Sequence, residues 1–311
     1  MPKQDNYDFF YDVMDEACML LYEHTNANYL DCLIRASLDL IEGINDNRLD
    51  KEALNKLDAI YEKLNEHNFS SEDIRLAFNL LLVKAFKHAK YPLDYIIPDS
   101  ISLVFANIIR TYFNKETYIN MLELNAKAAV LSNTIVNFLD FEVGCFAIEE
   151  DAKMANVAKI NFNLQQRDIV VYNNKAIDPC EVNCDVVIGE LKSRLQDDKY
   201  VPYYEITSKM RNLEEDGIFI FLIDNDFFNH TDMNAFRNRF TGTLLGLLIL
   251  PQTLFKGTIE KSILIGAKKQ IDDFDMLVLN LPNFADAVSL NEALIKIEDW
   301  IRDVRLAVLE K

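Results

Sequence analysis

The sequence of 311 residues has no long hydrophobic run, and this absence argues against a membrane protein. Its longest apolar stretches, such as Leu244–Leu250, are far shorter than the about 20 residues that a membrane-spanning helix needs. The chain begins with the polar and acidic stretch Met1–Asp5, whereas a secretory signal begins with basic residues and continues with apolar ones. We therefore expect a cytoplasmic protein with no membrane partner.

Cysteine is scarce and irregularly spaced, which argues against a disulfide framework. An odd number of cysteines in a long chain without a secretory signal is typical of reduced thiols. Cys180 and Cys184 are four residues apart, but no histidine lies nearby and no second pair supplies the further ligands that zinc prefers. The sequence therefore predicts no metal site. The five cysteines are Cys18, Cys32, Cys145, Cys180 and Cys184.

Positive charge is in deficit, with 32 Lys and Arg residues against 50 Asp and Glu and a formal net charge of −18. A protein that binds the DNA backbone normally has a basic surface, because neutralisation of phosphates supplies most of the affinity. The composition therefore disfavours DNA as a partner. Basic residues between positions 192 and 211 could still form a local patch, but interleaved acids favour a mixed solvated surface. These basic residues are Lys192, Arg194, Lys199, Lys209 and Arg211.

Helical periodicity dominates the first ninety residues. Apolar residues recur at three-to-four spacing over residues 10–21, 30–41, 54–64 and 74–86. Gly43 predicts the end of the second helix, and Ser70 with Asp73 predicts the start of the fourth. Four such helices can bury a small core, and the stretch Tyr91–Pro98 breaks the pattern. We predict a helical N-terminal domain over residues 1–92, through which two chains could form a homodimer.

Short apolar stretches alternate with helical ones after Pro98. Several of the predicted strands lack polar alternation, as expected when both faces of a sheet are covered. We predict an α/β domain over residues 93–311 with a doubly wound, Rossmann-like sheet of seven largely parallel strands. Its site should lie at the carboxyl ends of the first strands. The predicted strands are 118–124, 144–149, 168–172, 185–189, 217–223, 244–250 and 262–267, with 276–281 as a candidate eighth.

Several motifs of the α/β half point to one family. They are Pro98–Ile101, Leu213–Leu222, Leu250–Lys256, Lys261–Ile265, Leu281–Phe284 and Trp300. Together they resemble the N6-adenine-specific DNA methylases, which are class I S-adenosylmethionine-dependent methyltransferases, and most of all a small stand-alone branch found in low-GC Gram-positive bacteria. The likeness extends over residues 90–311 and more loosely over the helical part. It implies S-adenosylmethionine as cofactor and DNA as substrate.

The resemblance places part of the cofactor site in the loop after the first strand. Family members have an acid there and then two glycines, and this chain has Glu123, Asn125, Lys127 and Ala129, with the last two in place of the glycines. Glycine lets the backbone turn sharply and approach the cofactor, whereas a left-handed conformation costs other residues about 1–2 kcal/mol. Lys127 would also crowd the amino-acid end of the cofactor and bring its charge towards the sulfonium.

The other cofactor positions that the resemblance implies are Pro98, Glu149 and Asn174. By register, Ala147 stands where the family has the acid that binds the ribose hydroxyls, so that Glu149, two residues on, would have to replace it.

The fourth strand should carry the catalytic loop. Family members have an acid, an amide or a serine there, followed by two prolines and an aromatic residue that stacks on the flipped adenine. Glu190 holds the polar position and is the catalytic candidate. No proline follows it closely, and no aromatic residue follows until Tyr200. Both the rigid turn and the stacking platform are therefore missing from the sequence.

Three hypotheses of function follow. The first is an impaired or inactive member of the family that is retained for a structural or interaction role. The second is an active adenine-N6 methyltransferase with an unorthodox site, in which Glu123 and Glu149 bind the cofactor and Glu190 lies near the substrate amine. The third is a module that binds another nucleotide or metabolite at the same place. Each of these three glutamates also has a reading without a functional role. Glu123 and Glu149 could be solvated strand-end carboxylates, and Glu190 could be a surface glutamate.

Overall fold

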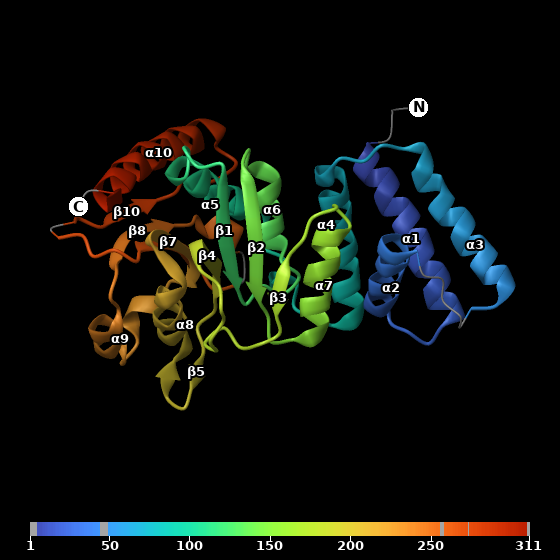
Figure 1. The fold of residues 1–311 in the computed structure, drawn as a ribbon, viewed down its shortest axis with the longest axis horizontal. Helices are drawn as coiled ribbons and strands as arrows, with labels where there is room; N and C mark the ends of the chain where they lie inside the picture. The colour runs from blue at the N-terminus through green and yellow to red at the C-terminus, as the bar shows by residue number, and fades with distance from the viewer. Residues whose placement is uncertain (1–4, 44–48, 256–257, 273, 310–311) are drawn as a thin grey trace.

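The computed structural model describes residues 5–43, 49–255, 258–272 and 274–309, and it contains a helical bundle beside an α/β unit (Figure 1). The bundle lies at one end of an elongated molecule and the C-terminal helix at the other. Lys256, the last residue of one motif that carries the family resemblance, lies outside the described residues. So do residues 1–4 of the polar N-terminal stretch.

Within the described part of the chain, four helices form the bundle: α1 (Asn6–His24), α2 (Tyr29–Glu42), α3 (Lys51–Glu62) and α4 (Ser71–Ala89). Each helix buries its apolar side in a shared core. The predicted capping box is confirmed, because Ser70 and Asp73 each accept a backbone N–H of the other. Gly43 ends α2 in a left-handed conformation, with a φ of 66°.

The α/β unit is built on a sheet of eight strands, counted over the described residues, in the order β10-β8-β9-β7-β4-β1-β2-β3. β9 runs antiparallel to β7 and β8, and the other neighbours are parallel. The predicted doubly wound α/β fold is confirmed, but the sheet has eight strands rather than seven because the stretch 276–281 joins its edge. The strands are β1 (Tyr118–Leu124), β2 (Glu142–Ile148), β3 (Val170–Tyr172), β4 (Cys184–Leu191), β7 (Leu213–Asp224), β8 (Thr243–Ile249), β9 (Lys261–Ala267) and β10 (Leu277–Asn280).

Helices cover both faces of the sheet. One face packs against α5 (Asp99–Tyr112), α6 (Val130–Phe138), α7 (Ala152–Asn163) and α10 (Ala287–Leu309). The other packs against α8 (Val201–Lys209) and α9 (Met233–Arg239). A small hairpin of β5 (Leu195–Gln196) and β6 (Lys199–Tyr200) precedes α8. Short 3-10 helices are η1 (Lys63–Glu66), η2 (Leu93–Tyr95), η3 (Met210–Asn212), η4 (Phe227–Asn229) and η5 (Gln252–Leu254).

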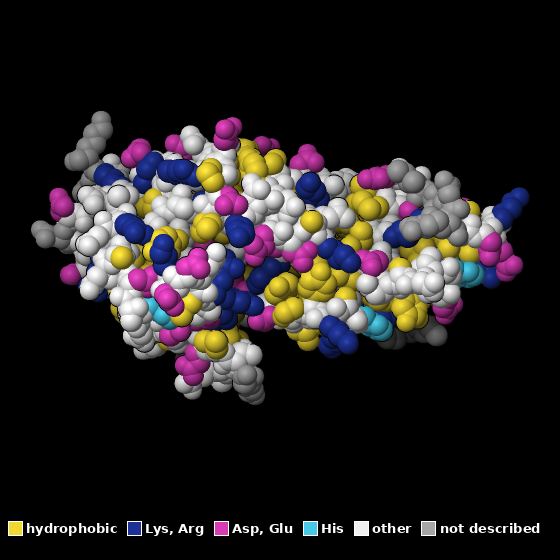
Figure 2. Space-filling model, turned by 90° about the horizontal axis from the view of Figure 1, so that it is seen from below, with side chains coloured by type: hydrophobic (Ala, Val, Ile, Leu, Met, Phe, Trp, Pro, Cys, Tyr) yellow, Lys and Arg dark blue, Asp and Glu magenta, His cyan; other side chains and the backbone are white. Residues whose placement is uncertain are grey.

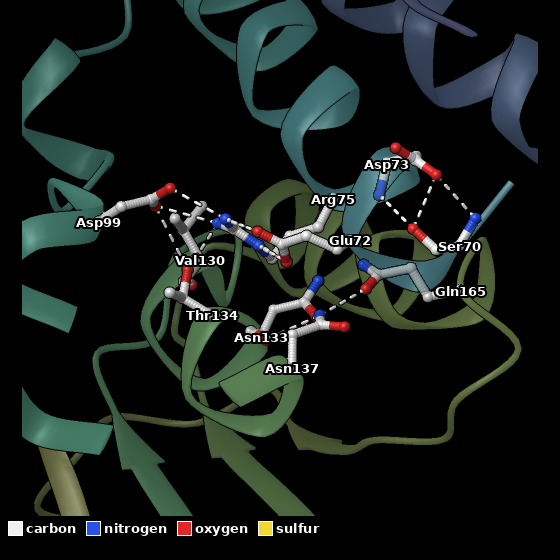
Figure 3. Close-up of polar contacts among 10 residues, drawn as sticks. All are labelled: Ser70, Glu72, Asp73, Arg75, Asp99, Val130, Asn133, Thr134, Asn137 and Gln165. Atoms are coloured by element: carbon white, nitrogen blue, oxygen red, sulfur yellow. Dashed lines mark hydrogen bonds and ion pairs between the residues drawn. The ribbon is translucent and has the colours of Figure 1, made fainter. Parts of the chain in front are cut away.

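A buried arginine fastens the bundle to the α/β unit. Arg75 of α4 is 3% exposed, and Figure 3 shows its guanidinium between Glu72, Asp99 and Thr134. It donates two hydrogen bonds of 2.7 Å to Glu72, two of 2.9 and 3.0 Å to Asp99, and one of 2.9 Å to Thr134. All five guanidinium donors are thus used. We call these four residues the Arg75 clasp, and it joins α4 to the first residue of α5 and to α6.

The described residues contain neither a membrane-spanning helix nor a cluster of metal ligands. No helix there is both long and apolar enough to cross a bilayer. No group of three or more His, Cys, Asp or Glu side chains is placed there to hold a metal ion. All five cysteines are unpaired thiols.

Candidate functional site

The loop between β1 and α6 has the backbone conformation that glycine normally provides. Asn125, Lys127 and Ala129 each have a φ of 53°, in the left-handed region. Asparagine tolerates this region, but a lysine and an alanine pay about 1–2 kcal/mol each. The loop stays tightly folded because the Ala126 N–H donates to the carbonyl of Ile148 and the Ala129 N–H donates to that of Ala126. The loop therefore adopts three left-handed conformations with no glycine at any of these positions.

The ammonium group of Lys127 does not point into solvent. Lys127 is 9% exposed, and its Nζ forms an ion pair with the carboxylate of Glu190, which is 4% exposed. Glu190 lies near the end of β4, one residue after Gly189, where an added Cβ would come within 2.5 Å of the carbonyl oxygen of Leu124. The close approach of β1 and β4 at Gly189 therefore brings the loop within reach of Glu190.

A second lysine completes this cluster from the other side. Lys261 Nζ lies 3.1 Å from Glu190 Oε1 and is also paired with Asp224. Asp224 and Lys261 face each other in the antiparallel register of β7 and β9. Burial alone would lower the pKa of Lys261, but the two carboxylates outweigh it and raise that pKa above its ordinary value. We call Lys127, Glu190, Lys261 and Asp224 the strand-edge network, in which two cations neutralise two anions.

Glu123 is buried beneath the same loop. It is 3% exposed on β1, and its Oε2 accepts the N–H of Ser132 at 3.3 Å in the first turn of α6. A carboxylate is favourable at a helix N-terminus, but here burial outweighs this contact and raises the pKa of Glu123 to about 7. Glu123 therefore acts as a helix cap that loses its proton only near neutral pH.

Glu149, directly after β2, is also engaged by the backbone. One of its carboxylate oxygens accepts the N–H of Lys127 at 2.6 Å, and the other accepts the N–H of Asp151 at 2.9 Å. Burial is the main cause that raises its pKa, and the two N–H contacts oppose it. Asn173 and Asn174 are both exposed, and the side chain of Asn173 donates to the Glu149 carbonyl at 2.8 Å. Glu149 thus ties the loop to the end of β2.

Asn125 joins a further buried carboxylate to the loop. Its amide donates to Glu205 Oε1 at 3.1 Å, and Arg194 Nη2 approaches the same oxygen at 2.6 Å. Glu205 is 1% exposed on α8, and burial raises its pKa although Arg194 acts in the opposite direction. This contact braces the loop against the far side of the sheet.

The segment before α5 covers the strand-edge network. The Tyr95 ring lies under two ammonium groups, with its centroid 5.1 Å from Lys127 Nζ and 5.4 Å from Lys192 Nζ. Asp94 forms an ion pair of 2.5 Å with Lys192. Pro98 follows as the N-cap of α5, directly before Asp99 of the Arg75 clasp. The linker from the bundle is thus held down over the carboxyl ends of β1 and β4.

Figure 2 views the molecule from below, the side to which β1 and β2 run in Figure 1. Lys and Arg side chains gather near the middle of this face, next to a hydrophobic patch. The rest of the face is mixed in charge. The edge of the sheet where a doubly wound fold normally binds its ligand therefore presents a small basic area and an apolar border.

The structure corrects expectations about four single residues. Glu190 is a buried ion-pair partner rather than a surface glutamate, and Glu123 and Glu149 are buried rather than solvated. Lys209 does not belong to a solvated surface, because it is 1% exposed and its Nζ contacts the carbonyl of Asp178. Its burial lowers its pKa. Each side chain is buried by an element distant in sequence, which a local charge pattern does not reveal.

Sequence reasoning brought together Glu123, Lys127 and Glu190 but missed their partners. Lys261 opens one of the family motifs and Asp224 directly follows a predicted strand, but neither was assigned a role, and Asp94 and Tyr95 belong to the predicted domain boundary. A signal was present for the first pair, because a lysine opening one strand and an aspartate closing another become neighbours when the strands are adjacent and antiparallel. For the linker residues no sequence signal existed.

Comparisons with known proteins agree with this architecture. Residues 8–86 match the model of the YtxK N-terminal helical domain. The chain is 20% identical to the uncharacterized protein YtxK of Bacillus subtilis (strain 168), over 96% of this chain and 99% of that protein.

Solved structures extend the likeness to the whole fold. A proposed class I S-adenosylmethionine-dependent methyltransferase from Listeria monocytogenes superposes with a TM-score of 0.85 and 25% identity, over 95% of this chain and 99% of its own. A methyltransferase subunit of a type I restriction-modification system from Streptococcus thermophilus superposes with a TM-score of 0.64 and 13% identity, over 87% and 71%. The structural neighbours are thus class I methyltransferases, and the chain has a methyltransferase-like, Rossmann-like fold with a YtxK-like helical domain.

Proposed function

We propose that this chain is a methyltransferase-like protein of the N6-adenine type whose cofactor site is closed from within, so that it is catalytically impaired or inactive and serves a structural or interaction role. The observation that carries the proposal is the buried ion pair between Lys127 and Glu190. The family resemblance implies a glycine of the cofactor loop at position 127 and the catalytic polar residue at position 190, so the pair would link these two parts of the site.

The charge of the network supports this proposal. S-adenosylmethionine carries a positively charged sulfonium, and Glu190 is the buried acid of β4 that could face it. Two ammonium groups, those of Lys127 and Lys261, already neutralise Glu190. A bound cofactor would have to displace Lys127 and leave its ammonium buried without a partner, which is costly. The residues present do not fit the cofactor in this arrangement.

The end of β4 gives separate support. Ser193 Oγ is hydrogen-bonded to Asp226 and to Tyr200, whose hydroxyl lies 2.8 Å away. Tyr200, the first aromatic residue after Glu190, is fully buried and stacks on His230 with ring centroids 3.6 Å apart. A flipped base needs an open aromatic face on which to stack, and Tyr200 does not offer one.

One observation favours the alternative of an active methyltransferase with an unorthodox site. The loop keeps its left-handed turns at Lys127 and Ala129 despite their cost, and Glu149 still closes the turn at the end of β2. A backbone under strain is often retained for a ligand. In this alternative the Lys127 side chain swings aside when S-adenosylmethionine enters.

Calorimetric titration of the full chain with S-adenosylmethionine separates these two functions. The closed-site proposal expects no saturable heat at ligand concentrations up to about 1 mM, a limit that corresponds to about −4 kcal/mol. Binding in the micromolar range would contradict it and support the alternative. S-adenosylhomocysteine, which lacks the sulfonium charge, serves as a matched ligand, because tighter binding of this neutral product would identify charge as the obstacle.

For the interaction role, we propose residues 1–92 as the partner-binding unit and a second copy of the chain as its partner. Light scattering coupled to gel filtration should show a dimer that Tyr22→Glu disrupts, because Tyr22 is 45% exposed on α1. A strict monomer would contradict this. DNA is disfavoured by the net charge, and a mobility-shift assay at two salt concentrations would reveal backbone binding as a strongly salt-dependent affinity.

A further inference from the structure

A groove opens on the face of the α/β unit opposite α5 and α6, away from the strand-edge network. It has a volume of about 530 Å³ and lies between the β5–β6 hairpin, α8, α9 and the loop after β3, which lie near one another at the lower left of Figure 1. Ligand pockets of small molecules have volumes of about 300–1,000 Å³. The groove is thus large enough for a small organic molecule and larger than an inorganic ion needs.

Two cations face this groove around one aromatic ring. The centroid of the Tyr204 ring lies 5.7 Å from Lys199 Nζ and 5.1 Å from Arg239 Cζ. Neither Lys199 nor Arg239 forms an ion pair with any residue that the structure describes. Asp197, at the turn of the hairpin, is the one carboxylate that lines the groove among those residues. In a chain with a net charge of −18, the lining of this groove therefore has two cations and one carboxylate.

The hydroxyl groups of the groove are arranged as acceptors. Thr207 Oγ1 donates its hydrogen to the carbonyl of Tyr203 at 2.9 Å, and Ser208 Oγ donates to that of Glu205 at 3.0 Å. With their hydrogens used in this way, both oxygens offer their lone pairs as acceptors to a ligand. A ligand that fits both halves of the groove must bring an anion for the cations and hydroxyl or amino donors for Thr207 and Ser208.

We propose that this groove binds a phosphate monoester that carries free hydroxyl groups, such as a sugar phosphate or a nucleoside monophosphate. Arg239 and Lys199 bind the phosphate, with the guanidinium able to make two parallel hydrogen bonds. The sugar hydroxyls donate to Thr207 and Ser208. The aliphatic side chains of Ile177 and Val201 line the remaining wall. The site is independent of the closed strand edge, since none of the strand-edge residues lines it.

Isothermal titration of the full chain with ribose 5-phosphate, adenosine 5′-monophosphate, inorganic phosphate, adenosine and citrate tests this assignment. The two monoesters should bind saturably and with an affinity that falls as salt is added. Adenosine, which lacks the phosphate, should not bind. Lys199→Gln and Arg239→Gln should each weaken binding by about tenfold or more, because each removes a charge-assisted contact.

The matched control is Lys115→Gln, at an exposed lysine between α5 and β1 outside the groove, which should bind like the unmodified chain. Unchanged affinity in both groove variants would overturn the assignment. So would an absence of saturable binding up to about 10 mM monoester, or binding of citrate without binding of either phosphate. Binding lost in a Lys127 variant but kept in the groove variants would place the ligand at the strand edge instead.

Discussion

The Arg75 clasp and the strand-edge network are both buried sets of charges, yet they differ in the backbone that carries them. Arg75 projects from the regular helix α4, and all five of its donors have acceptors. Lys127 projects from a loop residue in a left-handed conformation, and it shares Glu190 with Lys261. The Arg75 clasp thus has an unstrained backbone and an acceptor for every donor. The strand-edge network has a strained backbone and one carboxylate shared by two lysines.

This difference distinguishes the Arg75 clasp, which holds two units together, from the strand-edge network, which fills the candidate site with its own side chains. A saturated arginine on a helix does what packing requires, which is to fix two units against each other. A lysine on a backbone that suits glycine accepts a cost which packing alone does not explain. Strained backbone conformations of this kind cluster at functional sites. Substitutions at four positions test the comparison, from the largest expected effect to the smallest.

Arg75→Met should cause the largest loss of stability. It would leave Asp99 and Thr134 without their donor at the junction of α4, α5 and α6, and removal of one partner of a buried pair costs about 3–5 kcal/mol. Urea unfolding measures the change. Arg302→Met is the control, because Arg302 is 51% exposed on α10 and its pairs should contribute at most about 1 kcal/mol. Equal losses in both variants would remove the distinction between clasp and surface.

Glu123→Gln should change the pH dependence of stability. The folded-state pKa of Glu123, about 7, lies above the ordinary value of 4.5, so the folded protein keeps a proton that the unfolded chain has released. The resulting stabilisation is complete below about pH 4.5 and is lost as the pH rises through about 7, by an amount on the order of 3 kcal/mol.

In thermal unfolding from pH 5 to pH 8, Glu123→Gln should therefore flatten the profile and be the more stable protein at pH 8. Glu142→Gln, at an exposed residue that opens β2, is the matched control and should leave the profile as it is. A steep profile retained in Glu123→Gln would assign the titration to another group. The Arg75 clasp adds no such slope, because a guanidinium stays protonated throughout this range.

Lys127→Met and Lys127→Gly together separate the contribution of the ion pair to stability from the cost of the strained backbone. Methionine keeps the cost of the left-handed backbone but cannot form the ion pair with Glu190. Because Lys261 still neutralises Glu190, we expect the free energy of unfolding to fall by about 2 kcal/mol. Glycine also removes the cost of the left-handed conformation, so the Lys127→Gly protein should be more stable than the Lys127→Met protein by about 1 kcal/mol. If the two variants unfold at the same urea concentration, the loop stores no strain. Only Lys127→Gly should gain measurable affinity for S-adenosylmethionine in calorimetry.

Ala129→Gly should have the smallest effect, and it should be a gain. Ala129 has a φ of 53° as N-cap of α6, so glycine should stabilise the protein by about 1 kcal/mol in thermal unfolding. Ala126→Gly, in the same loop but outside the positive-φ set, should instead destabilise it by about 0.5–1 kcal/mol. If both glycine variants are less stable than the unmodified protein, the left-handed conformation has no cost at Ala129.

The sequence was sufficient for the fold because periodicity and capping are local. The capping box at Ser70, the end of α2 at Gly43 and the strand β1 all agree with expectation. The hairpin β5–β6 was missed, since strands of two residues leave no pattern to read.

The candidate site was predictable only in part. The left-handed turns at Lys127 and Ala129 agree with the family resemblance, which implies glycine at these two positions. That Lys127 turns inward to Glu190, rather than outward, depends on the approach of β1 and β4 at Gly189 and on the ring of Tyr95 above it. Such contacts join residues far apart in the chain, and they decide whether a charge is solvated or buried.

The loop after β1 is also held from two sides at once, because its residues and the first residue of α6 are divided between two cores. Ala126 and Ala129 pack with the sheet, whereas Ala128 and Val130 pack among the helices of the bundle. Removing residues 1–92 would thus remove the side chains that pack against Ala128 and Val130 and expose this side of the loop to water. The two halves depend on each other for shape, so recombination could not exchange one of them without also redesigning the other.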